Sequence, residues 1–168
     1  MFQMSLIVQK FGGTSVSNPE SLKTVANKII ACKESGNEVV VVVSAMGSST
    51  DELIDLAGEL SETPSPREMD MLLSAGERIT MSLLAIHLNN LGYESFSLTG
   101  SQAGITTTSR HGMAEIENIS GERVKEGIER GNIVIVAGFQ GVNKETKEIT
   151  TLGRGGSDAT AVALAASL

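Results

Sequence analysis

The segment EVVVVV at residues 38–43 constrains the fold more than any other part of the chain. Five consecutive valines favour a β-strand, because β-branched side chains suit extended backbone. Side chains of a strand point alternately to opposite faces, so an unbroken apolar run requires cover on both faces. This pattern is typical of a parallel sheet with helices on each side.

The rest of the chain alternates strand and helix patterns. We expect strands at 5–10, 93–100 and 132–139, short strands around an exposed turn at 143–150, and helices at 17–36, from about 51, 67–92, 121–131 and from 157. This order predicts an α/β fold, a layered α/β/α sandwich with a mainly parallel sheet. Ser17 or Asn18 fits the cap of the first helix, and Ser157 fits that of the last. The apolar run to Leu168 lacks the usual stop signals of a helix, so we expect the sequence to be part of a longer protein.

Composition excludes several classes of partner. The net charge is −7 and the basic residues form no dense block, which argues against nucleic acid. Aromatic content is 3% with no tryptophan, so base-stacking surfaces are not expected. No run approaches 18 apolar residues, and the start MFQMSLIVQK lacks a basic n-region, so we predict neither a membrane span nor a signal peptide. The cytoplasm is the expected compartment.

Several reactive residue types receive no chemical role. Cys32 is the only cysteine, which rules out an internal disulfide, and its apolar segment predicts buried packing. His87 and His111 have no metal-ligand partner at useful spacing, so no metal site is expected. The methionines of the long helix are interpreted as core filler: Met69, Met71 and Met81.

Two glycine-rich loops carry the strongest chemical signal. In LIVQKFGGTSV (6–16), an apolar strand ends at Lys10 and a turn at Gly12 and Gly13 leads toward a helix. Ligands of open α/β sheets lie at the carboxyl ends of strands, and glycine lets backbone N–H groups approach phosphate oxygens. The alternative is a tight turn beside a lysine whose stem lies along apolar surface.

The second loop is TTLGRGGSDATA (150–161), which places Arg154, Ser157 and Asp158 at a helix start. Helix N-termini carry free N–H groups and partial positive charge, which favour anions. A flexible loop in which Ser157 acts only as a helix cap is the alternative. Two glycine-rich, cation-bearing loops at strand-to-helix junctions favour phosphate binding.

Five motifs together resemble the aspartokinases of the amino acid kinase superfamily. They occur in the family's order and span essentially the whole chain: KFGGTSV (10–16), VVSAMGSSTDELI (42–54), LLSAGERI (72–79), GFQGV (138–142) and TTLGRGGSDATA (150–161). The resemblance implies the amino acid kinase fold, similar to carbamate kinase. It also implies that residues 1–168 form the N-terminal portion of the catalytic domain, without the C-terminal nucleotide-binding part and the regulatory ACT domains.

The resemblance implies catalytic roles for Lys10, which contacts the transferring phosphoryl group, and Asp158, which orients that lysine. It implies phosphate contacts by Gly12, Gly13, Gly156 and Ser157. For the amino acid it implies Ser44, Thr50, Glu77 at the amino group, Phe139 beside the pocket and Arg154 at the α-carboxylate.

From the residues alone, three of these positions fit other roles. Thr50 fits a helix N-cap, Glu77 fits a surface carboxylate beside Arg78, and Phe139 fits core packing at a strand end.

The implied activity is aspartate kinase, which transfers a phosphoryl group from MgATP to the β-carboxylate of L-aspartate. ATP, with Mg²⁺ carried by the nucleotide, is the implied cofactor, and the full-length protein is expected to be a homo-oligomer. We expect weak or no turnover from residues 1–168 alone. Another amino acid kinase, acting on glutamate, N-acetylglutamate or UMP, and a non-catalytic subunit of the same fold are the alternatives.

Overall fold

A parallel sheet forms the centre of the molecule. The computed structural model describes residues 5–168. The start of the segment MFQMSLIVQK, in which no signal peptide was predicted, lies outside the described residues. The sheet has the strand order β1 (Leu6–Phe11), β2 (Glu38–Val43), β6 (Ile133–Ala137) and β3 (Ser95–Leu98), and every pairing is parallel. The five valines of β2 are fully buried, which confirms that the strand is covered on both faces.

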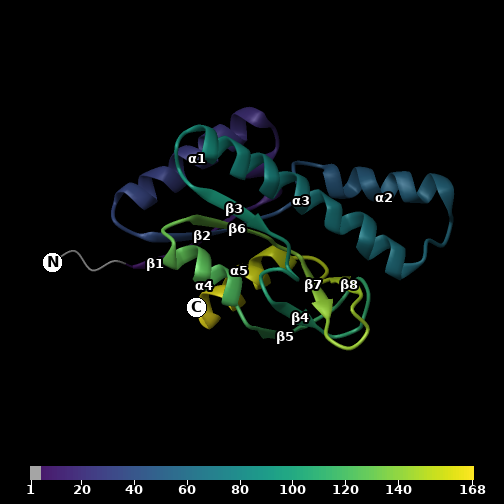
Figure 1. The fold of residues 1–168 in the computed structure, drawn as a ribbon. Coiled ribbons are helices and arrows are strands. Elements are labelled where there is room, and N and C mark those ends of the chain that lie inside the picture. Colours follow the sequence, from purple (N-terminus) through teal and green to yellow (C-terminus); the bar gives the residue numbers. More distant parts are fainter. Residues whose placement is uncertain (1–4) are drawn as a thin grey trace.

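Helices cover the two faces of this sheet (Figure 1). Val39, Val41 and Val43 pack into a core cluster with α1 (Pro19–Glu34) and α3 (Pro66–Asn90). Val40 and Val42 face the second cluster, to which α4 (Glu122–Glu129) and α5 (Gly156–Ser167) contribute. The alternating directions of consecutive valines thus supply both cores, and the predicted α/β/α sandwich is confirmed.

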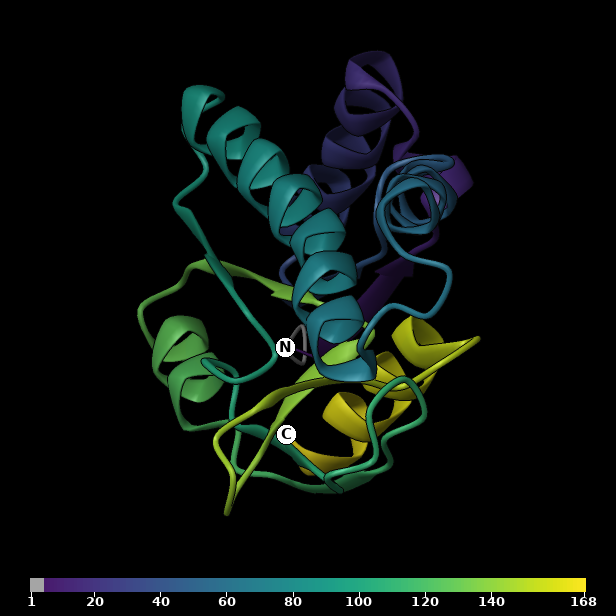
Figure 2. The same cartoon turned by 90° about the vertical axis from the view of Figure 1, so that its right-hand side faces the viewer.

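A second sheet, which the sequence did not predict, lies beside the first. It has the order β5 (Ile116–Ile119), β4 (Ile105–Thr107), β7 (Gln140–Asn143) and β8 (Ile149–Thr151). Its pairings are antiparallel except for β4 with β7. The short strands around residues 143–150 were predicted, but β5 was not. Figure 2 shows the lower end of α3 beside this sheet, so the helix joins both sheets.

Two short helical elements complete the description. A 3₁₀ turn, η1 (Gly13–Val16), follows β1, and α2 (Ser49–Leu60) packs against α3. Asn18 caps α1 by accepting a hydrogen bond from the Ser21 N–H, as one of the two predicted caps. Among the helices of residues 5–168, none is both long enough and apolar enough to cross a membrane.

Some residue-level expectations were wrong. Ser157 does not cap α5, because Gly155, at φ +77, occupies the cap position. Thr50 lies inside the first turn of α2, which has Ser48 at its cap. Cys32 packs against the first core cluster but is only half-buried. Of the three methionines taken as core filler, Met81 is buried, Met69 is half-buried and Met71 is 40% exposed.

Candidate active site

A cavity of about 790 Å³ opens at the carboxyl ends of β1, β2 and β6. Parallel strands end at the same edge of a sheet, so loops far apart in sequence meet there. All the residues that the sequence singled out as site candidates line this cavity: Lys10, Gly12, Gly13, Ser44, Thr50, Glu77, Phe139, Arg154, Gly156, Ser157 and Asp158.

Lys10 and Asp158 form an ion pair at one side of the cavity, with 2.8 Å between Nζ and Oδ1. The lysine side chain folds back over Gly12, where an added Cβ would lie 3.2 Å from Nζ. Asp158 lies in the first turn of α5, where a carboxylate also interacts favourably with the helix dipole. The lysine ammonium is therefore held at a helix N-terminus, in a position to face an anion in the cavity.

The first glycine turn is in direct contact with the loop that follows β2. The Gly13 carbonyl accepts a hydrogen bond of 3.0 Å from the Gly47 N–H. A Cβ on Gly13 would lie 3.0 Å from the Ala45 carbonyl oxygen, so a side chain would fit only if the backbone at Ala45 shifted. This close approach brings Lys10 and the half-buried Ser44 to the same cavity.

Glu77 is the most unusual side chain of the site. It is 3% exposed, and one carboxylate oxygen accepts a hydrogen bond of 3.2 Å from the Ala45 N–H. The other oxygen, Oε2, is buried and has no hydrogen-bond partner among residues 5–168. Burial raises the pKa of Glu77 from 4.5 to about 7, and backbone N–H groups oppose this rise. The alternative of a surface carboxylate is wrong.

Gly76 explains how this carboxylate reaches the cavity. A Cβ at this position would lie 2.7 Å from the Ala45 Cβ, so only glycine lets α3 pack against the loop after β2. That packing puts Glu77, the next residue on α3, within reach of the Ala45 N–H.

Phe139 follows β6 in a left-handed conformation, at φ +70, which is rare for a residue other than glycine. Its N–H donates to Thr160 Oγ1 at 3.1 Å, and its carbonyl accepts from the Leu152 N–H at 2.9 Å. The ring packs against Gly156, where a Cβ would lie 3.0 Å from Phe139 Cδ2. These contacts hold the ring at the cavity, so Phe139 both packs at the strand end and lines the site.

Arg154 lies in the loop between β8 and α5, flanked by Gly153 and Gly155 in left-handed conformations. It is exposed, and no ion pair holds its guanidinium within residues 5–168. Ser157 is nearly buried and lies against Gly138, where a Cβ would approach its Oγ to 2.8 Å. The loop therefore presents a cation from a backbone that is rich in glycine.

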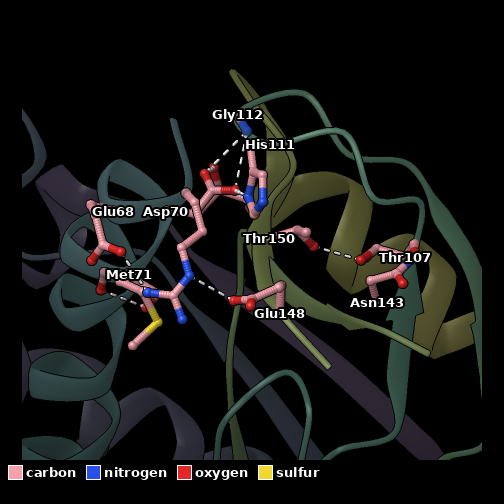
Figure 3. Close-up of polar contacts among 12 residues, drawn as sticks. Glu68, Asp70, Met71, Thr107, His111, Gly112, Asn143, Glu148 and Thr150 are labelled. Carbon is pink, nitrogen blue, oxygen red and sulfur yellow. Dashed lines mark hydrogen bonds and ion pairs between the residues drawn. The ribbon is translucent and has the colours of Figure 1, made fainter. Parts of the chain in front are cut away.

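Sequence reasoning missed a second buried acid at this cavity. Asp70 lines it together with Gly112 and Thr151, and it pairs with His111, to which no role was assigned (Figure 3). Asp70, Ser74 and Glu77 follow a helical spacing of i, i+4 and i+7, which places them on one face. Polar residues on the buried face of a helix were the signal that could have revealed Asp70. Across residues 5–168, no group of three or more His, Cys, Asp or Glu side chains could hold a metal ion.

Known proteins match the chain along nearly its full length. The aspartokinases of Corynebacterium efficiens and Geobacillus stearothermophilus are 59% and 61% identical over 165 residues, or 98% of this chain. A crystal structure of aspartate kinase from Synechocystis has a TM-score of 0.80 at 48% identity, over 98% of this chain and 26% of that one. These relatives confirm the resemblance to aspartokinases.

Other structures extend the likeness of fold. E. coli aspartokinase III, solved with aspartate and ADP, has a TM-score of 0.84 at 24% identity, and the match covers 98% of this chain and 47% of that one. The chain spans only about two fifths of the length of the curated relatives, 39% for the protein from C. efficiens and 40% for that from G. stearothermophilus. A family model described as the amino acid kinase family matches residues 5–168, and the chain belongs to that family.

Proposed function

We propose that the protein acts as an aspartate kinase, which converts L-aspartate and ATP to 4-phospho-L-aspartate and ADP. This reaction is the first step of lysine, threonine and methionine biosynthesis. One observation carries the choice of substrate: the buried Glu77 carboxylate has an oxygen that no group of residues 5–168 pairs with, and it lines a cavity that Arg154 also lines.

These two residues suit the two charged groups of an amino acid. A buried acceptor without a donor is costly, and a substrate ammonium would supply the missing donor and charge to Glu77. The planar guanidinium of Arg154 suits bidentate binding of the α-carboxylate. Ser44, Thr50 and Phe139 line the same cavity and complete the proposed amino-acid site.

Other residues that line the cavity suit the phosphoryl group. Lys10 supplies a full positive charge, Asp158 holds its ammonium, and the first turn of α5 supplies partial positive charge. Gly12, Gly13, Gly156 and Ser157 allow the backbone to approach phosphate oxygens. MgATP enters as substrate, with the Mg²⁺ carried by the nucleotide. The ion would neutralise part of the phosphate charge.

The chemistry requires positioning more than proton transfer. The β-carboxylate of L-aspartate has a pKa of about 4 and is already ionised at neutral pH. One of its oxygens forms a bond to the γ-phosphorus while the bond from that phosphorus to the bridging oxygen breaks, and ADP leaves with the electron pair. Two anions must approach each other, so cations and N–H groups that face the phosphoryl group lower the barrier.

Further features of the whole protein are proposed from its longer relatives. E. coli aspartokinase III was solved with aspartate and ADP. We propose that residues 1–168 supply the amino-acid site and part of the phosphate site. Adenine contacts and regulatory ACT domains would lie in further segments, in a cytoplasmic homo-oligomer. Light scattering on the full-length protein tests the oligomer.

The alternatives differ in the ligand that they place against Glu77. N-acetylglutamate has no ammonium, so its binding would leave the Glu77 oxygen unpaired in a buried site. UMP also lacks this group, whereas glutamate carries it and differs from aspartate by one methylene. A non-catalytic subunit of the same fold has no need of Lys10, Arg154 and Asp158, and all three are present.

A binding panel on this chain tests the proposal. Ligands would be L-aspartate, L-glutamate, N-acetyl-L-aspartate, N-acetyl-L-glutamate, UMP and MgATP, each at millimolar concentration, with the melting temperature as readout. Bound ligand stabilises the fold by RT ln(1 + [L]/Kd), so a modest site remains visible. We expect a shift with L-aspartate that N-acetyl-L-aspartate does not produce and that Glu77→Gln abolishes. A larger shift with another ligand, or equal shifts with the acetylated pair, would refute the assignment.

Turnover is measured separately. ADP release coupled to NADH oxidation, in the presence of L-aspartate, should be weak or absent for residues 1–168 and ordinary for the full-length protein. Rapid turnover by residues 1–168 would contradict the proposed division of the site between segments.

A further inference from the structure

Asp70 joins three separate segments through one buried carboxylate. It lies in the first turns of α3, is 1% exposed, and has His111 Nδ1 at 2.6 Å from Oδ2. The Gly112 N–H donates to both of its oxygens, at 3.1 and 3.2 Å, and the Thr151 hydroxyl donates to Oδ1 at 2.5 Å. Figure 3 shows Asp70, His111 and Gly112 facing one another where α3 meets the second sheet.

These contacts lead to the loop that carries Arg154. Thr151 is the last residue of β8, three positions before Arg154. Gly112 lies against the same loop, because a Cβ on Gly153 would be 3.2 Å from the Gly112 carbonyl oxygen. Asp70 therefore holds both the strand that enters the loop and the backbone on which the loop rests.

The loop needs such a support from outside itself. Gly153 and Gly155 on either side of Arg154 allow many backbone conformations, and no ion pair within residues 5–168 fixes the guanidinium. A binding group that is not held in place loses entropy when ligand binds, which weakens affinity. A rigid carboxylate at the base of the loop would reduce that loss.

We propose that Asp70 is a positioning residue: through Gly112 and Thr151 it fixes the loop at residues 152–156 and so places Arg154 for the carboxylate of the ligand. The ligand part of this proposal rests on the proposed function, whereas the fixing of the loop does not. If Asp70 only stabilised the fold, removing its hydrogen bond would affect the loop and the affinity no more than removing any comparable buried hydrogen bond.

Two neighbouring threonines of β8 allow that distinction. Thr150 and Thr151 are 0% and 1% exposed, and each hydroxyl makes one side-chain hydrogen bond of 2.5 Å. The Thr150 hydroxyl pairs with Thr107 of β4, away from Asp70 (Figure 3). Thr151→Val and Thr150→Val therefore remove matched hydroxyls from adjacent positions, and only the first contact belongs to Asp70.

The first readout needs no ligand. Amide nitrogen–proton NMR spectra of the chain and the two variants would follow the Gly153, Gly155 and Gly156 signals. We expect Thr151→Val to shift or broaden these signals and Thr150→Val to leave them close to the parent positions. Thr151→Ser keeps the hydroxyl and should restore the parent spectrum. Similar spectra for Thr151→Val and the parent, or equal changes in both valine variants, would overturn the proposal.

The second readout is the affinity for L-aspartate, measured by titration calorimetry at equal fractions folded. We expect Thr151→Val to raise Kd by about tenfold, Thr150→Val by less than twofold, and Thr151→Ser to recover most of the loss. Asp70→Asn should raise Kd more than Thr151→Val does. Asp55→Asn, which alters an exposed aspartate, is the control for the lost charge. Equal effects of the two valine variants would overturn the positioning role. If residues 1–168 bind no L-aspartate, the proposal that they supply the amino-acid site fails, and the NMR spectra alone decide for or against the fixing of the loop.

Discussion

Glu77→Gln should show how much the buried carboxylate lowers the free energy of unfolding, separately from its role in binding. In the unliganded protein the pKa of Glu77 is raised from 4.5 to about 7, chiefly by burial. Between these values the unfolded chain releases its proton while the folded chain keeps it, so the free energy of unfolding falls as pH rises. At about 1.4 kcal/mol per pKa unit, the expected loss between pH 4.5 and 8 is about 3 kcal/mol.

Glutamine keeps the shape of the side chain and the acceptor for the Ala45 N–H, but it does not ionise. Urea unfolding at half-unit steps from pH 4.5 to 8 would be measured for the parent, for Glu77→Gln and for Glu59→Gln, which alters an exposed glutamate of α2. We expect the parent to lose about 3 kcal/mol more than Glu77→Gln over this range. Parallel curves for the parent and Glu77→Gln would refute the reasoning, whatever their absolute stabilities.

Binding of L-aspartate should reverse the rise in the pKa of Glu77. A substrate ammonium favours the ionised carboxylate, so binding lowers the pKa of Glu77 and the apparent affinity falls as protons compete. From a pKa of about 7 in the free protein, we expect Kd for L-aspartate to rise about tenfold between pH 8 and pH 6. Constant affinity across this range would mean that Glu77 does not pair with the ammonium.

Three other predictions address single contacts. Gly76→Ala places a Cβ 2.7 Å from the Ala45 Cβ, so it should destabilise the fold by about 1–3 kcal/mol and weaken L-aspartate binding; an unchanged urea midpoint would contradict the close packing. Lys10→Met removes the cation that pairs with Asp158, and the full-length protein should lose at least about 100-fold in ADP release with little change in L-aspartate binding; near-parental turnover would exclude a catalytic role. Asn18→Ala removes the cap of α1 and should lower the free energy of unfolding by about 1 kcal/mol without changing ligand affinity, as urea denaturation and calorimetry would test.

The central sheet and the position of the cavity could be predicted because both depend on strong local patterns. The apolar runs of β2 and β6 require cover on both faces, which leads to a parallel sheet and to strand ends that share one edge. Gly12, directly after β1, marks where the backbone turns at that edge, and the glycines before α5 mark the loop that enters the cavity from the second sheet. Each of these inferences needs only the residues next to it in sequence.

The second sheet has no such pattern. Its strands have three or four residues, and polar pairs such as Thr107 with Thr150 fill part of its interior. Strands this short show neither an apolar run nor a clear alternation, so β5 left no recognisable signal. The cap predicted at Ser157 was wrong because the helix begins earlier: the left-handed Gly155, two residues before Ser157, occupies the cap position. Asp70 and His111 are 41 residues apart, and only tertiary structure brings them together.

Asp70 and Glu77 show how the donors around a buried acid indicate its role. Both lie on the same face of α3, both line the cavity, and both are almost completely buried. Burial alone therefore cannot tell a structural carboxylate from one that binds ligand. Asp70 has donors for each oxygen from within the chain, whereas Glu77 accepts a hydrogen bond from the Ala45 N–H and its second oxygen has no partner among residues 5–168. An ionised carboxylate can accept several hydrogen bonds, so the unmet capacity at Glu77 has to be filled by a proton or by a ligand donor. Burial raises the pKa of Glu77 and so favours the proton, whereas a cationic group that enters the cavity should pair with Glu77 in preference to Asp70.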